Sequence, residues 1–364
     1  MNRPLESIMR KLMTTLTAAA LFLSVFPRFS PAAEEYRLSL NLPIPPIHSR
    51  WHNAIKPWFD ELTERSGGRI VVEPYFAEAI SKQSESMDSV RNGLADFAES
   101  SFGMAIGQFP FYERVFDVVD LGRSMEQTNT ILHEMERSFP QIRDEVKGVK
   151  MLFTHTLPVG MLIGTQKPVT KLSDLKGMKI AVVGGATTAS RLKALGASIV
   201  NIPVIDIYMS LQQGIIDGSM VDFQLLTSRR FGDILKHVTL LPLNGGQFYC
   251  CMNQDVYDSM PEDLQKIIDD MSGEYAEKRF TEFWYQDQYS SMKKWKEEMG
   301  GRLHMLSDED YARANEMVKP VEAEWIEQVS RNGLPGADML KLFRELEQQH
   351  HPLWKNSEMA KYVD

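Results

Sequence analysis

The chain has 364 residues and a formal net charge of −9, with 43% hydrophobic and 24% charged residues. The negative charge argues against nucleic-acid binding, which requires a basic surface. The length exceeds what one hydrophobic core usually organises, so two lobes are expected.

Residues 1–33 have the features of a secretory signal. Arg3, Arg10 and Lys11 form a positive region, residues 12–25 are apolar, and residues 30–32 offer a small-x-small cleavage site. The apolar run is shorter than the roughly 20 residues that a membrane span needs. We therefore predict export, cleavage and a mature protein that does not span the membrane. Removing residues 1–32 takes away four positive groups and one negative group, which leaves a charge of −12.

The next part of the chain alternates between strand-like and helix-like patterns. Strands are predicted at residues 36–42, 69–75, 95–98 and 150–156, and helices at residues 51–65, 84–92 and, more loosely, 117–147. Strands that alternate with helices predict α/β units on mostly parallel sheets. Residues 157–166 then lead into a second lobe.

Residues 172–218 carry the most informative pattern. A buried strand over residues 179–183 is followed by the glycine pair Gly184 and Gly185, a helix that ends at Gly196, a short strand over residues 199–203 and a second helix. A glycine-rich turn before a helix is also typical of phosphate-binding sites. Because no complete GxGxxG and no Gly-Lys-Ser/Thr is present, the nucleotide interpretation is weak.

The last third is predicted to be mostly helical. Residues 240–253 are expected to form one strand returning to the first lobe, and a very long helix is expected from Pro261 to about Met299. The two cysteines are the neighbours Cys250 and Cys251. A disulfide between neighbours on a strand would be strained, so we expect two buried hydrophobic side chains and no redox role.

The order of these motifs resembles the solute-binding proteins of TRAP (tripartite ATP-independent periplasmic) transporters. Residues 172–218 are similar to the family pattern LKGxKIRV…LGAxPVxMPxxExYxALQxGxxDG. Weaker matches lie at residues 66–70 (TGGRI in the family), 92–98 (xGxxDMA) and 260–264 (LPEDV). The resemblance covers about residues 36–300 and implies a two-lobed α/β fold of the periplasmic-binding-protein type, with an interlobe cleft and a long bracing C-terminal helix.

The resemblance also implies domain boundaries. Residues 1–33 are the signal, residues 34–155 with 244–283 form the first lobe, and residues 156–243 form the second. The helical residues 284–364 are expected to brace both lobes.

Four positions that hold polar ligand-binding residues in the family are apolar in this chain. The family's ligand-clamping arginine falls on Ala181, a second arginine on Gly160, a glutamine on Ala79 and an asparagine on Val221. An arginine fork matches a carboxylate with two hydrogen bonds, so its loss indicates a changed ligand or a charge supplied from elsewhere.

Some candidate ligand-binding residues follow predicted strand ends, where open α/β sheets bind ligands, and others lie on strands, at the family's ligand positions or where a replacement charge is sought. The candidates are Trp51, Ser100, Ser101, Phe102, His155, Ala181, Val221, Arg229, Arg230 and Phe248.

For several candidates a structural role remains open. Trp51 is either core or a cleft wall, and His155 is either a structural histidine or a ligand contact. Arg229 and Arg230, expected near the start of a helix, are either solvated or supply the charge missing at Ala181. A metal site at His48 and His52 is not expected, because no third ligand is visible.

The sequence therefore predicts a periplasmic receptor of a TRAP transporter, without cofactor, metal or catalytic residues. It is expected to capture a small organic ligand, such as an aromatic or amphipathic acid, and to deliver it to the small and large membrane subunits. Walls formed by Trp51, Phe102 and Phe248 also fit an amine, with Asp222 or Glu99 supplying negative charge. The alternative is a secreted enzyme or ligand-sensing receptor that uses the same fold.

Overall fold

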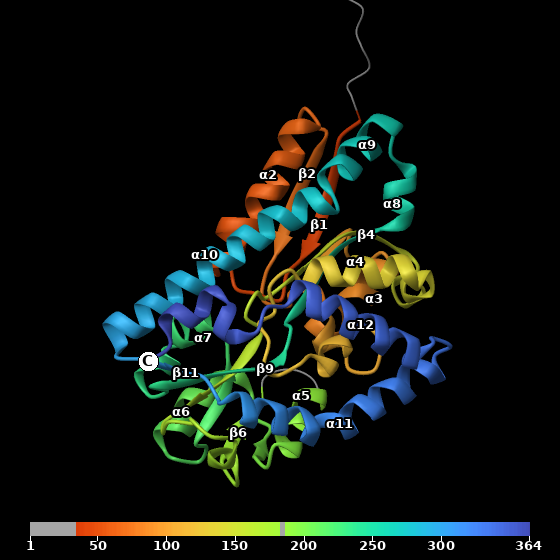
Figure 1. Ribbon diagram of the computed structural model, residues 1–364. Coiled ribbons are helices and arrows are strands. Elements are labelled where there is room, and N and C mark those ends of the chain that lie inside the picture. The colour runs from red at the N-terminus through yellow and green to blue at the C-terminus, as the bar shows by residue number, and fades with distance from the viewer. Residues whose placement is uncertain (1–33, 183–185) are drawn as a thin grey trace, which may run out of the picture. The chain divides into compact units, whose positions relative to one another are not determined.

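Two mixed β-sheets carry the fold of the computed structural model, which describes residues 34–182 and 186–364 (Figure 1). Residues 37–364 form one compact unit. The predicted signal at residues 1–33, and Gly184 and Gly185, lie outside the described residues.

The first sheet lies mainly in the amino-terminal part of the chain. Its spatial order is β2 (Ile70–Tyr75), β1 (Tyr36–Asn41), β3 (Phe97–Ser101), β10 (Gln247–Asn253) and β4 (Val149–Thr156). β1 and β3 are parallel, whereas β10 runs antiparallel to both β3 and β4. The carboxyl ends of β3 and β4 therefore meet the amino end of β10 at one edge.

The second sheet contains the motif at residues 172–218. Its order is β11 (Arg302–His304), β9 (His237–Asn244), β5 (Met161–Thr165), β8 (Gly218–Val221), β6 (Lys179–Ala181) and β7 (Ser198–Val200). β5 is antiparallel to β8 and β9, so the prediction of mostly parallel sheets is wrong in detail. The antiparallel strands β5 and β10 are those that the chain enters when it crosses from one sheet to the other.

The predicted strand over residues 240–253 is two strands. β9 ends at Asn244 in the second sheet, and β10 begins at Gln247 in the first sheet. Gly246 has a φ of +55°, and a Cβ on Gly245 would lie 2.5 Å from Cδ2 of Phe116. The glycine pair thus makes a tight turn that side chains would block.

Short helices connect the strands of both sheets. They are α2 (Lys56–Arg65), α3 (Ser86–Arg91), α4 (Thr128–Ser138), α5 (Ala186–Ala194), α6 (Ile207–Gln212) and α7 (Phe223–Ser228). A single π-helical turn, Trp51–Ile55, precedes α2. In the region of residues 117–147, which was predicted as helical throughout, α4 is joined by 3₁₀ segments at Val115–Val118 and Pro140–Val146.

The carboxyl-terminal helices lie against elements of both sheets. They are α8 (Gln254–Ser259), α9 (Glu262–Met271), α10 (Glu274–Met299), α11 (Asp308–Arg331) and α12 (Gly336–His350). The single helix predicted from Pro261 to Met299 is broken at Gly273, whose φ of +55° is not helical. α10 contacts β4 and α7, and Figure 1 shows it running from α9 to α7. β11 interrupts residues 284–364, which were predicted to be helical.

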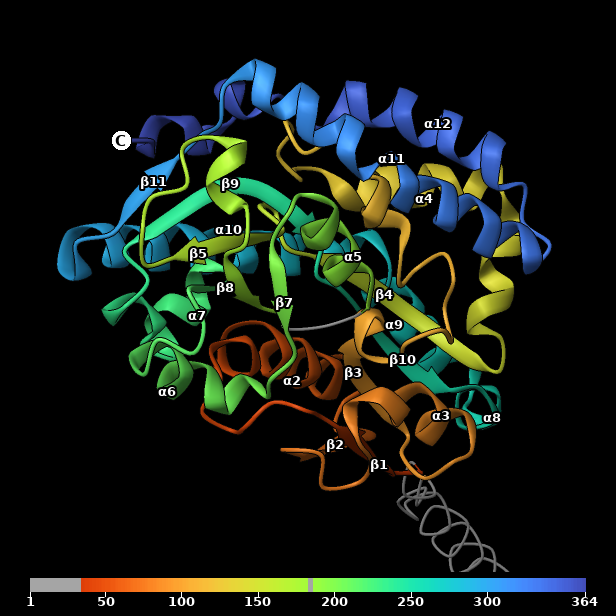
Figure 2. The ribbon, with the colours of Figure 1, turned by 90° about the horizontal axis from the view of Figure 1, so that it is seen from below.

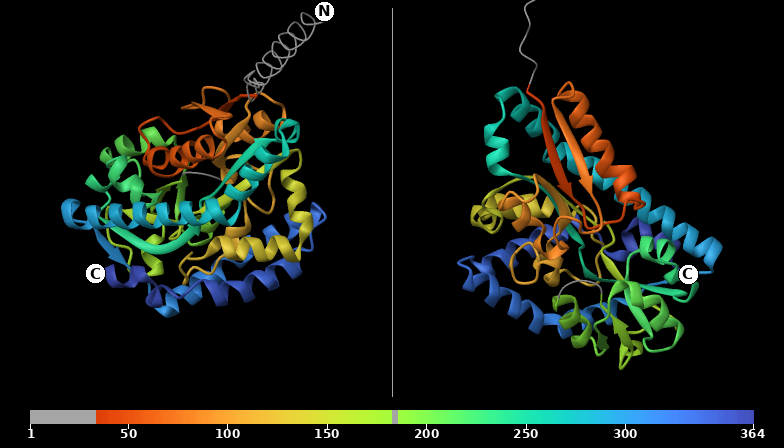
Figure 3. Two further views of the ribbon diagram at one scale, coloured as in Figure 1. Left: turned by 90° about the horizontal axis from the view of Figure 1, so that it is seen from above. Right: turned by 180° about the vertical axis from the view of Figure 1, so that it is seen from behind.

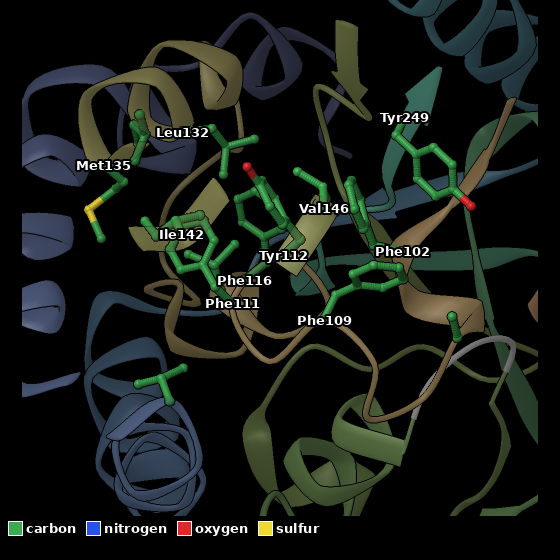
Figure 4. Close-up of a cluster of buried hydrophobic side chains, with 14 of the residues drawn as sticks. Phe102, Phe109, Phe111, Tyr112, Phe116, Leu132, Met135, Ile142, Val146 and Tyr249 are labelled. Carbon is green, nitrogen blue, oxygen red and sulfur yellow. The ribbon is translucent and has the colours of Figure 1, made fainter. Parts of the chain in front are cut away.

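α11 and α12 form a second helical layer. They pack on each other and α12 packs on α4, as Figure 2 and both views of Figure 3 show. An aromatic core lies beneath this layer (Figure 4), where Phe102 stacks on Tyr112 with ring centres 4.6 Å apart and touches Phe109 and Tyr249. Within residues 34–182 and 186–364, no helix is both long and apolar enough to cross a bilayer.

The strands of each sheet come from two stretches of the chain. β1 to β4 and β10 build the first sheet, and β5 to β9 with β11 build the second. The exact domain boundaries stay a prediction.

Candidate functional site

A buried polar and aromatic cluster lies at the edge where β3, β4 and β10 meet. We call it the Arg50 cluster, and its members are Arg50, Glu99, His155, Phe248 and Trp284. Nη2 of Arg50 lies 3.3 Å from Oε2 of Glu99, and both side chains are almost fully buried. The guanidinium carbon lies 4.4 Å from the centre of the Phe248 ring and 5.7 Å from that of Trp284. A cation thus sits between a carboxylate and aromatic faces.

His155 connects the cluster to α10. Nε1 of Trp284 donates to Nδ1 of His155 at 2.9 Å, and Nε2 of His155 lies 3.1 Å from Oε1 of Glu99. An indole can only donate, so the His155 proton is on Nε2 and faces Glu99. Burial lowers the pKa of His155, which keeps the ring neutral at pH 7.

The electrostatics of the cluster favour a charged Glu99. Burial raises the pKa of Glu99, but Arg50 and the hydrogen bond from His155 outweigh it and hold that pKa below its ordinary value. Nε of Arg50 is buried and has no hydrogen-bond partner in the described part of the chain. The arginine therefore has a donor that no described protein group uses.

A second polar group joins the two sheets beside the cluster. Nε2 of Gln224 donates to Oγ of Ser49 at 2.9 Å, and that hydroxyl donates to Oδ1 of Asp287 at 3.0 Å. Asp222 caps α7, accepting a hydrogen bond from the amide of Leu225 at 2.7 Å. Burial, opposed by this hydrogen bond, raises the pKa of Asp222 to about 6.

Ser49, Gln224 and Asp287 of this second group line a pocket of about 630 Å³. It lies between the loop after β1, which contributes His48 and Ser49, and α7, which contributes Gln224. Asp287 of α10 closes one side, and Arg229 lies in its wall. Its size suits a small organic molecule, and its walls follow the carboxyl ends of β1 and β8.

Another pocket, of about 520 Å³, is less suited to be the ligand site. It is lined by His133, Glu277 and five β4 residues, Val149 and Met151 to Thr154, so it opens along the side of β4 and not at its carboxyl end, Thr156. Ligands of open α/β sheets bind at carboxyl ends of strands. We therefore favour the edge that carries the Arg50 cluster.

Several predicted residues lie in or beside the Arg50 cluster. His155 and Phe248 belong to it, with their rings stacked 5.0 Å apart. Trp51 directly follows Arg50 and packs edge-on against Phe76. Ser101 ends β3, and its hydroxyl donates to the carbonyl of Gln247 at 3.1 Å.

Other predicted residues lie elsewhere. Phe102 is fully buried in the aromatic core, and Ser100 is buried with its hydroxyl donating to the carbonyl of Gln83. Ala181 and Val221 are buried at the ends of β6 and β8.

The prediction that Arg229 and Arg230 stand near the start of a helix is wrong. They follow the end of α7, where the chain leaves the helix and Arg230 has a φ of +58°. Both are exposed, and Arg230 pairs with Asp233 at 2.7 Å.

Sequence reasoning missed Arg50, Trp284 and Gln247. Arg50 stands beside the predicted Trp51, and Gln247 follows the glycine pair, but neither pattern shows what the side chain faces. Arg191 is also buried, and it donates to the carbonyls of Phe116, Val119 and Leu243. Arg191 is thus held by main-chain carbonyls, although its Nε, like that of Arg50, has no hydrogen-bond partner in the described residues.

Among the described residues, no group of three or more His, Cys, Asp or Glu side chains is arranged to hold a metal ion. His48 faces the pocket, and His52 is exposed. Burial, with the charge of Arg50, lowers the pKa of His48 to about 4.

Comparison with known proteins gives a consistent result. A model of the family described as bacterial extracellular solute-binding protein, family 7, matches residues 44–328. A solute-binding protein of Verminephrobacter eiseniae is 26% identical over 217 residues, which is 59% of this chain and 64% of that relative. The matched part thus spans slightly less than two thirds of the relative.

Solved structures share the fold over most of the chain. A TRAP periplasmic solute-binding protein from Desulfovibrio salexigens, an open complex with the C-terminus of a symmetry mate in its ligand-binding site, has a TM-score of 0.77 at 24% identity, covering 89% of this chain and 98% of its own. A marine metagenome TRAP solute-binding protein from an unidentified microbe has a TM-score of 0.76 at 27% identity, covering 87% and 99%. It is specific for aromatic acid ligands and was solved with metahydroxyphenylacetate.

The family model covers most of the chain, and the structural neighbours confirm the predicted two-lobed α/β fold. The chain therefore belongs to the bacterial extracellular solute-binding proteins of family 7, the solute-binding proteins of TRAP transporters.

Proposed function

We propose that this protein is a periplasmic receptor that captures an aromatic carboxylic acid and delivers it to the membrane subunits of a TRAP transporter. The observation that carries the proposal is Arg50, a buried arginine that lies over Phe248 and keeps an unpartnered Nε within the described residues. Its position, at the edge where strands of the first sheet end, is where an α/β sheet binds ligand.

The Arg50 cluster suits both parts of such a ligand. A carboxylate can use the donors of Arg50 that Glu99 leaves free, and a hydrogen bond to a charged group contributes about 1.5–3 kcal/mol. The partly exposed side chain of Phe248 and that of Trp51, the residue after Arg50, provide apolar area for a ring. Edge-to-face packing of an aromatic ring adds about 0.5–1.5 kcal/mol beyond the area that is buried.

The marine metagenome protein supports the same ligand class. It is specific for aromatic acid ligands and is 27% identical over 87% of this chain. The apolar residues at Ala181, Gly160, Ala79 and Val221 also fit a ligand with fewer polar groups than a dicarboxylate or a sugar acid.

Capture is proposed to occur by closure of the two lobes around the ligand. The chain crosses between the sheets from β4 to β5, from β9 to β10 and, through α8 to α10, from β10 to β11, so bending at these crossings would move one sheet relative to the other. The bond between Gln224 and Ser49 joins α7 to the loop after β1 and would stabilise the closed form. Binding without chemical change is the expected behaviour.

Isothermal titration calorimetry of the mature protein tests the proposal. 3-Hydroxyphenylacetate, phenylacetate, tryptophan, succinate and galacturonate are compared at the same pH and salt. We expect an aromatic acid to bind most tightly and to be recovered unaltered by mass spectrometry. Tightest binding of galacturonate or succinate, or recovery of an altered ligand, contradicts the proposal.

A second candidate is an aromatic amino acid. Oδ2 of Asp287 is buried without a hydrogen-bond partner in the residues described, and the capping Asp222 lies on the α7 side of the same region. An ammonium group would pair with these acids while Arg50 holds the carboxylate. Tighter binding of phenylalanine than of phenyllactate would favour this candidate.

A further inference from the structure

Gln247, the first residue of β10, has a buried carboxamide that the protein does not use. The residue is only 4% exposed, and within residues 34–182 and 186–364 neither Oε1 nor Nε2 has a hydrogen-bond partner. Its backbone carbonyl, in contrast, accepts from Oγ of Ser101 at 3.1 Å. Burial without a partner is unfavourable because the hydrogen bonds to water are lost and not replaced.

The turn before Gln247 is held by hydrogen bonds and close packing. Oδ1 of Asn244 accepts from the amide of Gly246 at 2.6 Å, and Nδ2 of Asn244 lies 3.3 Å from Oγ1 of Thr188. A Cβ on Gly246 would lie 2.5 Å from Cδ1 of Leu157, so the turn is also tightly packed. The turn is therefore held by Asn244 and by packing against Leu157, without a hydrogen bond from the Gln247 carboxamide.

Gln247 stands at the ligand edge of the first sheet. It pairs with Thr156 at the carboxyl end of β4, and the next residue, Phe248, pairs with Ser101 at the end of β3. Neighbours on a strand point to opposite faces. The side chains of Gln247 and Phe248 thus point to opposite faces of the sheet at this end of its strands.

We propose that Gln247 is a ligand-contact residue whose carboxamide pairs with a polar substituent of the bound acid, so that the receptor prefers hydroxylated aromatic acids to unsubstituted ones. This inference rests on the proposed function. A hydroxyl group can donate to Oε1 or accept from Nε2. An unsubstituted ring would leave the buried carboxamide unpaired. A site that leaves a buried polar group unpaired discriminates strongly against such a ligand.

The rival explanation is an ordered water molecule that satisfies the carboxamide. Buried waters form two to four hydrogen bonds and are part of the folded structure. In that case Gln247 has a structural role, and replacing it would lower the stability of the free protein without changing which acid is preferred.

The test compares the wild-type protein with Gln247→Met, which keeps the length of the side chain and removes its amide. For the free variant we expect a melting temperature about 2 °C higher, because an unpaired buried group has been removed. We expect the wild-type protein to bind 3-hydroxyphenylacetate about tenfold more tightly than phenylacetate, and the variant to lose this preference. Gln247→Asn, which retracts the carboxamide by one methylene group, should also lose it.

Thr239→Val is a matched control. Thr239 is buried in β9, and its hydroxyl donates to the carbonyl of Val169 at 2.8 Å. The control should melt at a lower temperature and keep the wild-type preference, since its buried hydrogen bond is already made inside the protein.

The outcomes separate the two proposals. A Gln247→Met protein that melts at a lower temperature, or that retains the wild-type preference, overturns the role of Gln247 alone. Wild-type protein that binds both acids without preference also overturns that role. Wild-type protein that binds neither acid overturns the proposed function, and this inference with it.

Discussion

Trp284 of α10 donates a hydrogen bond to Nδ1 of His155, with 2.9 Å between the nitrogens. His155 in turn faces Glu99, which pairs with Arg50. The long helix is therefore connected through one neutral histidine to the charge pair at the edge of the first sheet. Any ligand that engages Arg50 acts on a network that also positions α10.

His155, which is buried, and His48, which is half-buried, should make the protein less stable in mild acid. Burial lowers the pKa of His48 to about 4 and lowers that of His155 as well, from an ordinary value of 6.5. As the pH falls below 6.5 the unfolded chain binds protons first, so stability that is complete above 6.5 decreases until about pH 4. For His48 the loss is ~2–3 kcal/mol. Urea unfolding of wild type and His48→Gln at pH 7.5 and 4.5 measures it.

The control for this experiment is His52→Gln, because His52 is exposed. His52→Gln should retain the wild-type pH dependence, and His48→Gln should flatten it. Equal pH dependence of His48→Gln and the wild-type protein would contradict the prediction.

Asp222 should have the opposite effect. Burial, opposed by the cap hydrogen bond, raises its pKa from 3.8 to about 6. The folded protein takes up this proton first as the pH falls, so the destabilisation is present above pH 6 and is relieved toward pH 4. Asp222→Asn keeps an oxygen that caps α7. It should raise the free energy of unfolding by ~1–3 kcal/mol at pH 7.5 and leave it unchanged at pH 4.

Asp222→Ala distinguishes the charge from the cap. It removes both, and loss of the cap costs about 0.5–2 kcal/mol. Asp222→Ala should therefore be less stable than Asp222→Asn at every pH. If Asp222→Asn were less stable than the wild-type protein at pH 7.5, the Asp222 charge would be paired in the folded protein.

Replacing Arg50 should affect stability and binding through different partners. Arg50→Met leaves Glu99 charged and buried without its cation, which costs about 3–5 kcal/mol of stability. It also removes the proposed carboxylate contact, so affinity for 3-hydroxyphenylacetate should fall by about 1.5–3 kcal/mol. Thermal unfolding and calorimetry measure the two effects separately.

The double variant Arg50→Met/Glu99→Gln separates these effects. Glutamine at position 99 retains an oxygen for the His155 hydrogen bond and removes the unpaired charge. Most of the lost stability should return, whereas ligand affinity should remain low. Recovery of affinity together with stability would remove Arg50 from the ligand site.

The sequence predicts the repeating units of the fold well and its crossings less well. The strands near residues 36–42, 69–75 and 150–156 are found because each is a short local pattern between turn residues. The split at Gly245 and Gly246 is missed because β-rich residues lie on both sides, and alternation does not reveal that the chain changes sheets. The break at Gly273 had a visible signal, a glycine inside a long helical pattern.

The sequence predicts only those site residues whose positions are set by strands and the loops that follow them. His155, Phe248 and Trp51 lie in or beside the Arg50 cluster because strands and their following loops place them there. Arg50 itself depends on a contact with Glu99, a residue 49 positions later, and on packing against α10. No local pattern records such a contact, so a charge was sought at Arg229 and Arg230 instead.

Arg229 and Arg230 should differ in their effect on ligand association. Both are exposed, but Arg229 lines the pocket whereas Arg230 pairs with Asp233. An exposed cation at a pocket mouth mainly raises the association rate, and salt screens it. Arg229→Gln should slow association a few-fold at low salt and have no effect at 0.5 M salt. Arg230→Gln is the matched control, and stopped-flow fluorescence makes the measurement.

Dicarboxylates should bind weakly to this protein. In the predicted alignment the family's clamping arginine falls on Ala181, which is buried at the end of β6, and a second arginine falls on Gly160. Succinate would bring two carboxylates to a site whose buried cation, Arg50, already pairs with Glu99. A carboxylate that is buried without a partner loses its hydration and binds poorly. We therefore expect dissociation constants for succinate and malate on the order of 1 mM, corresponding to about 4 kcal/mol of binding free energy. Calorimetry alongside 3-hydroxyphenylacetate on the same preparation makes the comparison, and a submicromolar constant for either dicarboxylate would show that the site has a second cation for the other carboxylate.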